Sequence, residues 1–509
     1  MRIAVVHGYF LGDSGSGVYV RNVAQALVAL GHEVTLVCQE REPQRYEFID
    51  SVWALDPSNT RLRPLAARAP MGPGSCRLVR PDLGERLLVY VDGPFAGFPR
   101  EGVKAFQDAP GDWVESYLAA NIAALRAAFV EWPPNLVLTH HAFAQPYVAR
   151  QALGGSAPYV VTCHGSELNF TLKCDERLAR YAFDGLADAA AVVAVSATSA
   201  QDAIGWAAAH DLVIADRTSV IPPGIDTERF TPAPSRRAAI DEVTAHLELP
   251  GGFKLSAEDD ILAFAGRIGW TKGIQHAVAA LSLVAAVRPR AKLLVAGAGP
   301  AREALTRLAA LLSAGDVDGA RRLAAFDPEL RTTDEYGPLV PKSLAAPGGT
   351  SETVAGDGAA VSNEAAVGAA FGPARVAYLG HLAAPDVARV FAAADLALTP
   401  SVFPEAAALV TSEALSSGAL PIVTYQSGLR QMADIEADIL GDDAFRGLVP
   451  GRDLTLGLAE EIVRQLDRYP TRDAGFREAM HEVAIEHFPS WRSVAQQHID
   501  LGLGRSGRA

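Results

Sequence analysis

The sequence predicts an α/β protein with two Rossmann-like domains. Short apolar runs alternate with segments of helical periodicity along most of the 509 residues, which is typical of repeated βαβ units and a parallel sheet. The chain is too long for one hydrophobic core of ordinary size, so two domains are expected. The alternation begins a second time after a polar stretch at 231–260. We therefore place the hinge near 222–234.

The first half is predicted to form a Rossmann-like domain at 1–230. Residues 18–30 have apolar side chains at helical spacing and end at Gly31. The strands expected in this half are 3–6, 33–37, 136–139, 159–162, 191–195 and 219–221. A segment at about 40–110 is rich in Pro, Arg and Gly and has no clear period, so we interpret it as an insertion.

The second half is predicted to form another Rossmann-like domain at 231–487. Its expected strands are 261–265, 292–296, 375–379, 396–399 and 420–423. The periodicity is lost at about 313–372, and 345–358 has the low complexity of a flexible insertion, although a substrate lid is the alternative. The sequence from Phe488 to Trp491 begins a last helix, within 488–509.

Composition restricts the function classes. Hydrophobic residues make up 49% and charged residues 20%, as in soluble globular proteins. The net charge of −14 argues against a nucleic-acid or anionic-membrane partner, and no run approaches the roughly 18 apolar residues of a membrane span. The apolar N-terminus is too short for a signal peptide, and the four cysteines lack metal-ligand spacing. We expect a cytoplasmic protein with reduced thiols.

Two glutamates, Glu405 and Glu413, are the most informative residues. They follow the predicted strand at 396–399 and lead into an alanine-rich helix. A strand, a polar loop and a helix N-terminus form a place where α/β proteins bind phosphorylated ligands. Carboxylates would repel phosphate, so they suit hydroxyl groups instead, with Glu405 on a sugar and Glu413 on a ribose. The pattern predicts a nucleotide-sugar site.

A basic loop from Gly266 to Gly273 lies between the strand at 261–265 and the next helix. It contains Arg267 and Lys272, and a guanidinium with an ammonium can neutralise a diphosphate leaving group. The alternative is an exposed basic loop without a ligand. The glutamate pair favours the diphosphate interpretation.

A glycine-rich loop at 12–17 is a weaker signal. It permits close approach to a phosphate or substrate, and it is also the usual sign of a dinucleotide fold. In a dinucleotide fold an acidic residue should end the second strand, where 37–40 offers only a marginal candidate.

His164 follows the predicted strand at 159–162 and so lies at the ligand edge of the sheet. A local structural role is the alternative, and it applies more strongly to the other histidines at strand ends, His7, His140 and His141. Cys163 stands beside His164, but no third residue would orient the pair for nucleophilic catalysis.

Together these motifs resemble the retaining GT-B glycosyltransferases of family four, along nearly the whole chain. The motifs are Gly15-Ser16-Gly17, Gly31-His32-Glu33-Val34, His164-Gly165, Val195-Ser196, Ile221-Pro222-Pro223-Gly224-Ile225-Asp226, Gly266-Arg267, Lys272-Gly273, Gly297-Ala298-Gly299-Pro300, Leu379-Gly380 and Glu405 with Glu413. Their order and spacing are more specific than any single motif. The resemblance implies a GT-B fold, with two domains facing across a cleft and a C-terminal helix that returns to the N-domain. It also implies that 1–230 is the acceptor domain and 231–487 the nucleotide-sugar domain.

The resemblance also implies roles for particular residues. Arg267 and Lys272 would hold the donor diphosphate, Glu405 the sugar hydroxyls and Glu413 the ribose. The implied catalytic residues are His164, Arg267, Lys272 and Glu405. The remaining implied donor contacts are Gly15, Ser16, Gly17, Gly266, Gly380, His381, Leu382, Ala406, Ala407, Ala408 and Leu409. The chain has Ala407-Ala408 where the family usually has Phe-Gly, which puts the seat of the sugar in doubt.

The expected reaction is retaining and independent of metal. No Asp-x-Asp pair lies at a predicted strand end, so Arg267 and Lys272 must stabilise the developing dianion. Front-face attack, with the leaving phosphate accepting the proton, is implied by the resemblance.

We expect transfer of a hexose-type sugar from a nucleoside diphosphate sugar, with UDP or GDP, to a small soluble acceptor such as a building block of a specialised metabolite. The nucleotide sugar is a co-substrate and no other cofactor is expected. Nucleic acid and integral membrane partners are not expected, and a homodimer is left open. The alternatives are a GT-B nucleotide-sugar 2-epimerase, an NAD-dependent oxidoreductase based on the loop at 12–17, and an inactive sugar-nucleotide binding module.

Overall fold

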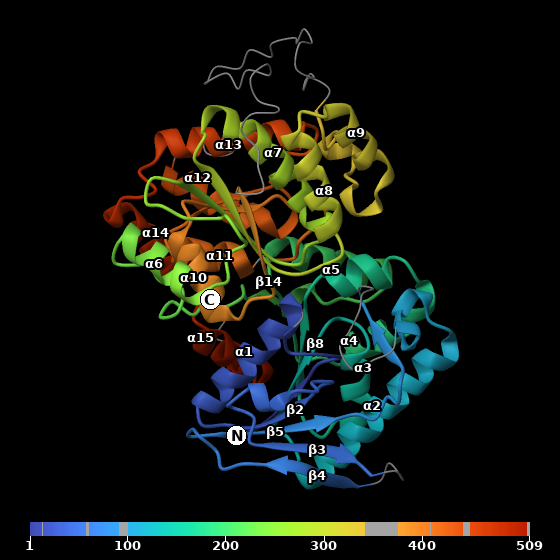
Figure 1. Ribbon diagram of the computed structural model, residues 1–509. Helices are drawn as coiled ribbons and strands as arrows, with labels where there is room; N and C mark the ends of the chain where they lie inside the picture. The colour runs from blue at the N-terminus through green and yellow to red at the C-terminus, as the bar shows by residue number, and fades with distance from the viewer. Residues whose placement is uncertain are drawn as a thin grey trace. The chain divides into compact units, whose positions relative to one another are not determined.

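The chain forms two compact units (Figure 1). The N-terminal unit comprises 1–224 together with 489–509, and the C-terminal unit comprises 225–488. The computed structural model describes residues 1–12, 14–56, 61–90, 100–341, 375–407, 409–440 and 448–505. Ala408 and the low-complexity stretch at 345–358 therefore lie outside the described residues. Each unit is built on a parallel sheet covered by helices, which confirms the predicted α/β class.

The N-terminal unit contains a nine-stranded sheet in the order β11-β10-β9-β8-β1-β2-β5-β3-β4. The strands are β1 Arg2–Val6, β2 Glu33–Val37, β3 Ser51–Leu55, β4 Leu62–Ala67, β5 Ser75–Arg80, β8 Leu136–His140, β9 Tyr159–Cys163, β10 Ala191–Ala194 and β11 Thr218–Val220. Every neighbouring pair is parallel except β3 and β4. Two short strands, β6 Leu87–Val89 and β7 Val103–Ala105, pair separately. The central strands β1, β2, β8 and β9 are almost entirely buried, because both faces of the sheet are covered.

Helices cover both faces of this sheet. They are α1 Gly15–Ala29, α2 Gly111–Glu131, α3 Gln145–Leu153, α4 Ala179–Ala187, α5 Ala197–Ala209 and α15 Trp491–Gly502. The core under α2, α3 and α4 includes Val137 and Val161, whereas Gly502 of α15 faces Leu136 and Val160. Successive strand residues point to opposite faces, so α15 lies on the face opposite to α2–α4.

The last helix returns to the first unit, as the sequence predicted. The hydroxyl of Ser490 caps α15 by accepting a hydrogen bond from Ser493 N. The helix packs against α1, and Thr162 Oγ1 lies 3.1 Å from His498 Nε2.

Two parts of the N-terminal unit differ from the sequence-based interpretation. The predicted insertion at about 40–110 supplies β5, β3 and β4, which extend the main sheet beyond β2. Its strands escaped recognition because β4 and β5 contain arginines among their apolar residues and Pro64 lies within β4. The glycines at 15–17 form the first turn of α1 rather than a loop before it, because Ser14 caps the helix earlier than the apolar pattern begins.

The C-terminal unit contains a five-stranded parallel sheet in the order β14-β13-β12-β15-β16. The strands are β12 Asp260–Ala265, β13 Ala291–Ala296, β14 Val376–Gly380, β15 Leu396–Thr399 and β16 Leu420–Val423. The helices are α6 Arg236–His246, α7 Ile274–Val287, α8 Arg302–Ser313, α9 Val317–Phe326, α10 Ala384–Ala393, α11 Leu409–Ser416, α12 Arg430–Leu440, α13 Leu454–Arg468 and α14 Ala474–His487. α7 packs between α8 and α13, while α6 and α10 pack together.

The region at 313–341, where the sequence pattern is lost, is ordered into short elements. It contains α9 and the 3-10 turns η8 Pro328–Leu330 and η9 Asp334–Tyr336. Leu330 and Tyr336 are fully buried in the core that contains α7 and α13. Elements this short carry too few residues to establish a helical period. In the part of the chain that the structure describes, no helix combines the length and the apolar character needed to cross a membrane.

Candidate donor site and a buried histidine cluster

The carboxyl edge of the C-terminal sheet gathers the predicted donor loops. All five strands are parallel, so the loops that follow them leave the sheet at the same edge, where open α/β sheets bind ligands. β12 and β15 are direct neighbours, with Leu262 opposite Leu396. The basic loop after β12 and the glutamate loop after β15 therefore lie side by side.

Lys272 and Glu405 join these two loops. Lys272 Nζ lies 2.5 Å from Glu405 Oε1, and Ser401 Oγ donates to the same oxygen at 2.7 Å. The Lys272 side chain is 36% exposed, and a pair this accessible adds little to folding stability. Among the described residues, none donates to Glu405 Oε2. The pair thus fixes the direction of the ammonium and leaves one carboxylate oxygen for a ligand hydroxyl.

Gly273 allows the two loops to approach closely. It has φ +68°, and a Cβ on this residue would lie 1.7 Å from Pro400 O. Val402 N donates to Thr271 O at 3.0 Å across the same contact. Any larger residue at 273 would push apart the loops that carry Lys272 and Glu405.

Arg267 occupies the exposed start of the basic loop. The backbone around it is held by hydrogen bonds from Ile268 N to Ala298 O at 2.9 Å and from Gly269 N to Arg267 O at 3.0 Å. Within the described residues its guanidinium forms no ion pair. Arg267 and Lys272 therefore place two cations on one short loop at the ligand edge.

The loop after β16 supports the glutamate loop, and sequence reasoning missed it. Thr424 Oγ1 donates to Ser401 O at 2.8 Å, and Gln426 Nε2 donates to the same carbonyl. Gly428 N donates to Glu405 O at 2.7 Å, and a Cβ at 428 would lie 1.9 Å from Ala406 O. The sequence feature that could have revealed this loop is a polar Thr-x-Gln, followed by a glycine, directly after a predicted strand.

The other predicted donor residues are distributed along this edge. Gly380 ends β14 and accepts a hydrogen bond from Gly297 N at 2.7 Å, and exposed His381 and half-buried Leu382 follow it. Gly266 directly follows β12. Ala406 and Ala407 precede α11, Leu409 is its first residue, and half-buried Glu413 lies in its second turn.

In the N-terminal unit the corresponding edge carries a buried histidine cluster, formed by His7, His140, His141 and His164. His140 Nδ1 lies 3.0 Å from His164 Nε2, and the rings of His7 and His141 stack at 5.6 Å. His7 directly follows β1, and His164 directly follows β9. Parallel strand ends thus bring together all four histidines that the sequence placed at strand ends.

Glu167 organises this cluster and was not predicted. Its carboxylate accepts hydrogen bonds from His164 N at 2.9 Å and Ala142 N at 3.1 Å, and its other oxygen lies 3.1 Å from His141 Nδ1. Burial alone would raise its pKa, but the hydrogen bond and charge of His141 lower the pKa to about 2. The sequence feature that could have revealed Glu167 is an acidic residue three positions after His164.

Three histidines of the cluster, His7, His140 and His164, remain neutral near pH 7. Burial lowers the pKa values of His7, His140 and His164 well below their usual range, and neighbouring histidines lower them further. Burial also raises the pKa of the Cys163 thiol, which disfavours a thiolate nucleophile. His164 is therefore suited to hydrogen bonding rather than to carrying charge.

The predicted glycine motif caps α1 in the same unit. Ser14 Oγ accepts a hydrogen bond from Gly17 N at 3.0 Å and lies 3.1 Å from Ser16 Oγ. Gly15 has open space where a side chain would be. The motif thus leaves the first turn of α1 accessible at Gly15.

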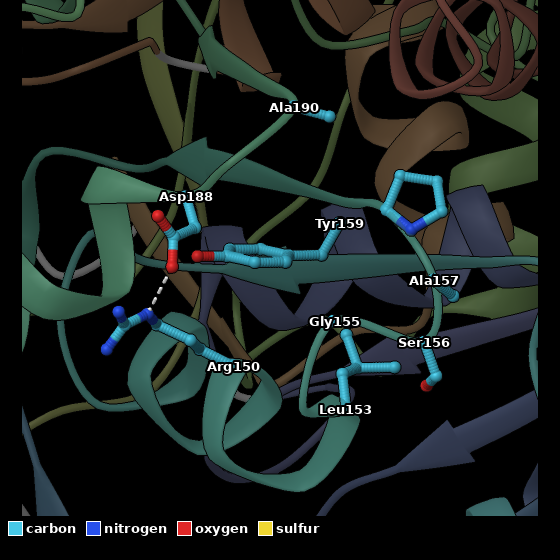
Figure 2. Close-up of a pocket in the computed structure, with 9 residues that line it drawn as sticks. Arg150, Leu153, Gly155, Ser156, Ala157, Tyr159, Asp188 and Ala190 are labelled. Carbon is cyan, nitrogen blue, oxygen red and sulfur yellow. Dashed lines mark hydrogen bonds and ion pairs between the residues drawn. The ribbon is translucent and has the colours of Figure 1, made fainter.

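The N-terminal unit has a cavity of about 370 Å³ at the edge of its sheet opposite to the carboxyl edge, where open α/β sheets bind ligands (Figure 2). It is lined by Arg150, Leu153, Gly155, Ser156, Ala157, Pro158, Tyr159, Asp188 and Ala190. Tyr159 begins β9 and Ala190 precedes β10, so the cavity borders the amino ends of the strands. Arg150 Nε and Asp188 Oδ2, 2.7 Å apart, form an ion pair with each other.

Solved glycosyltransferases share this architecture. Sucrose-phosphate synthase from Thermosynechococcus elongatus is 20% identical, with a TM-score of 0.61 and coverage of 99% of both chains. The Anabaena protein Alr3699/HepE in complex with UDP-glucose is 15% identical, with a TM-score of 0.56, 99% of this chain covered and 100% of that one. Starch synthase IV from Arabidopsis thaliana bound to ADP and acarbose is 15% identical, with a TM-score of 0.55 and coverage of 99% and 98%. At these identities the likeness establishes the GT-B fold.

Family models identify the sequence itself. A glycosyl transferase 4-like domain matches residues 14–224, and a glycosyl transferases group 1 domain matches residues 339–468. A search of the curated proteins finds no match. The two domain matches do not overlap and together cover more than half of the chain, in the order that the sequence motifs predicted. The chain belongs to the group 1 glycosyltransferases.

Proposed function

We propose that this glycosyltransferase transfers a hexose-type sugar from a nucleoside diphosphate sugar, with retention of anomeric configuration and without a metal, to a small soluble acceptor. UDP or GDP is the proposed nucleotide. The solved structure of the Anabaena protein with UDP-glucose supports a nucleotide-sugar donor. The nucleotide sugar is a co-substrate, and no resident cofactor is proposed.

The observation that carries the proposal is the joined pair of loops at the C-terminal sheet edge. Arg267 and Lys272 offer positive charge at one loop, and Glu405 offers a hydroxyl-binding oxygen at the next. A donor laid along this edge would place its diphosphate on the cations and its sugar on the carboxylate. This division of charges distinguishes a nucleotide sugar from a simple phosphate ester.

The proposed chemistry follows from charge development. The bond between the anomeric carbon and the phosphate oxygen breaks, and the electron pair leaves with the nucleoside diphosphate. Positive groups that already point at the developing charge lower the barrier without reorganisation. The acceptor hydroxyl forms its bond on the same face, and its proton passes to the departing phosphate oxygen. Arg267 and Lys272 thereby supply the stabilisation that a divalent ion supplies elsewhere.

Two measurements test this proposal. A thermal-shift screen with UDP, GDP and ADP should raise the melting temperature with one nucleotide most strongly, because ligands that bind only the folded state stabilise it. With the matching sugar nucleotide and an acceptor, free nucleoside diphosphate should be released, and EDTA should leave the rate within about twofold. Complete loss in EDTA, restored by magnesium or manganese, contradicts metal independence. Release that needs no acceptor, or none at all, contradicts transfer.

A further inference from the structure

Trp270 connects three segments at the donor edge. Its ring meets the ring of Phe403 edge to face at 6.4 Å, and the guanidinium of Arg331 lies over it at 4.4 Å. Trp270 stands two residues before Lys272, and Phe403 stands two residues before Glu405. The aromatic contact therefore parallels the ion pair that joins the same two loops.

The segment that carries Arg331 is firmly anchored beside the basic loop. Gln275 Nε2 donates to both Trp270 O and Arg331 O, each at 2.9 Å. The next residue is also fixed, since Thr332 Oγ1 lies 3.0 Å from His276 Nε2. These hydrogen bonds fix the backbone of Arg331 beside Trp270.

This anchored segment lies between the two family matches, which end at 224 and begin again at 339. It belongs to the ordered elements at 313–341 that the sequence pattern did not reveal. Arg267, Trp270 and Lys272 lie in the same range, so neither family match covers the contact between Arg331 and Trp270.

The guanidinium of Arg331 keeps its charge available. The side chain is exposed and forms no ion pair within the described residues. A guanidinium stacked on an indole gains cation–π attraction while its N–H groups still point outward in their plane. Arg331 thus adds a third cation beside the basic loop, at Trp270, and its stacking restrains the Trp270 ring.

We propose that Arg331 and Trp270 are positioning residues for the donor diphosphate. Arg331 clamps Trp270, and Trp270 holds the basic loop against the glutamate loop, so that Lys272 and Arg267 are in place before the donor binds. This inference rests on the proposed function, because it assumes that the basic loop receives a diphosphate.

The test compares Arg331→Ala, Arg331→Lys and Trp270→Leu with the control Arg322→Ala, which removes an exposed arginine from α9 in the same region at 313–341. Calorimetry with whichever of UDP, GDP and ADP the wild type binds should show affinity about threefold to fivefold weaker for Arg331→Ala and about tenfold weaker for Trp270→Leu. Arg331→Lys should restore part of the loss. Affinity for the matching nucleoside without phosphates, and the melting temperature, should stay unchanged in the two Arg331 variants.

The outcomes separate this inference from the proposed function. Equal affinities in Arg331→Ala and Arg322→Ala, with a wild type that binds the nucleotide, overturn the role of Arg331 alone. An equal loss for nucleoside and nucleoside diphosphate shows that the clamp does not serve the diphosphate and also overturns it. A wild type that binds none of the three nucleotides overturns the proposed function and this inference together.

Discussion

Each unit places polar residues at the carboxyl edge of its own parallel sheet. The side chains at this edge are positively charged in the C-terminal unit, whereas histidines of the N-terminal unit are neutral there. In the C-terminal unit, the cations Arg267 and Lys272 remain accessible to water. In the N-terminal unit, His140 is fully buried and His164 half-buried, and burial lowers their pKa values. Topology fixes where a ligand edge lies, whereas burial decides whether that edge carries charge.

This contrast suits a reaction that separates charge. An anionic leaving group needs cations that stay charged at every physiological pH, and exposed arginine and lysine satisfy that requirement. In the proposed function, an uncharged sugar hydroxyl needs a directional hydrogen-bond partner, and the neutral imidazole of His164, whose backbone N–H donates to Glu167, would provide one. The proposal therefore gives charge stabilisation to Arg267 and Lys272 and orientation to His164.

The largest expected effect is that acid destabilises the N-terminal unit first. A buried histidine with a lowered pKa binds a proton in the unfolded chain but not in the folded one, so stability is complete above pH 6.5 and falls as the pH drops toward the folded pKa. The pKa of His498 is lowered by burial to about 4, which corresponds to about 3 kcal/mol below that pH. His7, His140 and His164 add to this loss in the same direction.

Hydrogen exchange at pH 7 and pH 5 measures this difference. Amides of β1, β8 and β9 should lose more protection at pH 5 than those of β12 and β13. The C-terminal unit also contains a buried histidine, His276, whose pKa is lowered by burial to about 3, so it loses stability through this histidine, whereas the N-terminal unit loses stability through His7, His140, His164 and His498 together. A His498→Gln variant should flatten the pH dependence of the N-terminal unit. Equal loss of protection in both sheets would contradict the electrical contrast.

The next largest effect concerns the two cations. Arg267→Ala and Lys272→Ala should each lower kcat/KM about a hundredfold, because a lost charge-assisted contact in the transition state costs about 3 kcal/mol. Denaturant unfolding should change little, since both side chains are accessible. Lys254→Ala, which removes an exposed lysine from the same unit, is the matched control. Turnover near that of the control in both variants would refute the diphosphate assignment.

A smaller effect should distinguish the two glutamates. Glu405→Gln should lower turnover about tenfold while leaving affinity for the nucleoside diphosphate nearly unchanged, because the carboxylate is proposed to bind the sugar and not the nucleotide. Glu413→Gln should instead weaken the nucleoside diphosphate itself, through the ribose. Calorimetry with the nucleoside diphosphate measures both variants. If the affinity falls equally in the two, the roles have been assigned wrongly.

The sequence predicted most of the sheet because its signals are local. Strands such as 33–37 and 396–399 are short and mostly apolar, and the structure places β2 and β15 on the same residues. The sequence predicted the loop that carries Lys272 and the loop that carries Glu405, but it did not predict that these two residues form an ion pair. Their meeting depends on β12 and β15 being neighbours, and a strand order is a property of the whole fold.

The supporting residues were harder to predict because they act through the backbone. Gly428 N donates to Glu405 O, and the Glu167 carboxylate accepts from His164 N. Each residue supports the backbone of a candidate site residue, and the sequence does not show which backbone groups will meet in the fold. Arg331 lies in short elements whose length hides any period. The candidate site could be located from the sequence, while the residues that position it required the fold.

The smallest expected effect concerns the low-complexity stretch at 345–358, outside the described residues. Arg331 and its neighbours contact the donor edge through aromatic and charged groups, whereas 345–358 contains no aromatic residue and only two acidic ones. Its small side chains offer too little apolar surface to offset the entropy of ordering the backbone. Replacing 345–358 with a Gly/Ser linker should therefore leave the Michaelis constants for donor and acceptor within about threefold, less than one lost hydrogen bond typically costs. A hundredfold loss of acceptor efficiency at an unchanged melting temperature would show instead that this stretch closes over substrate.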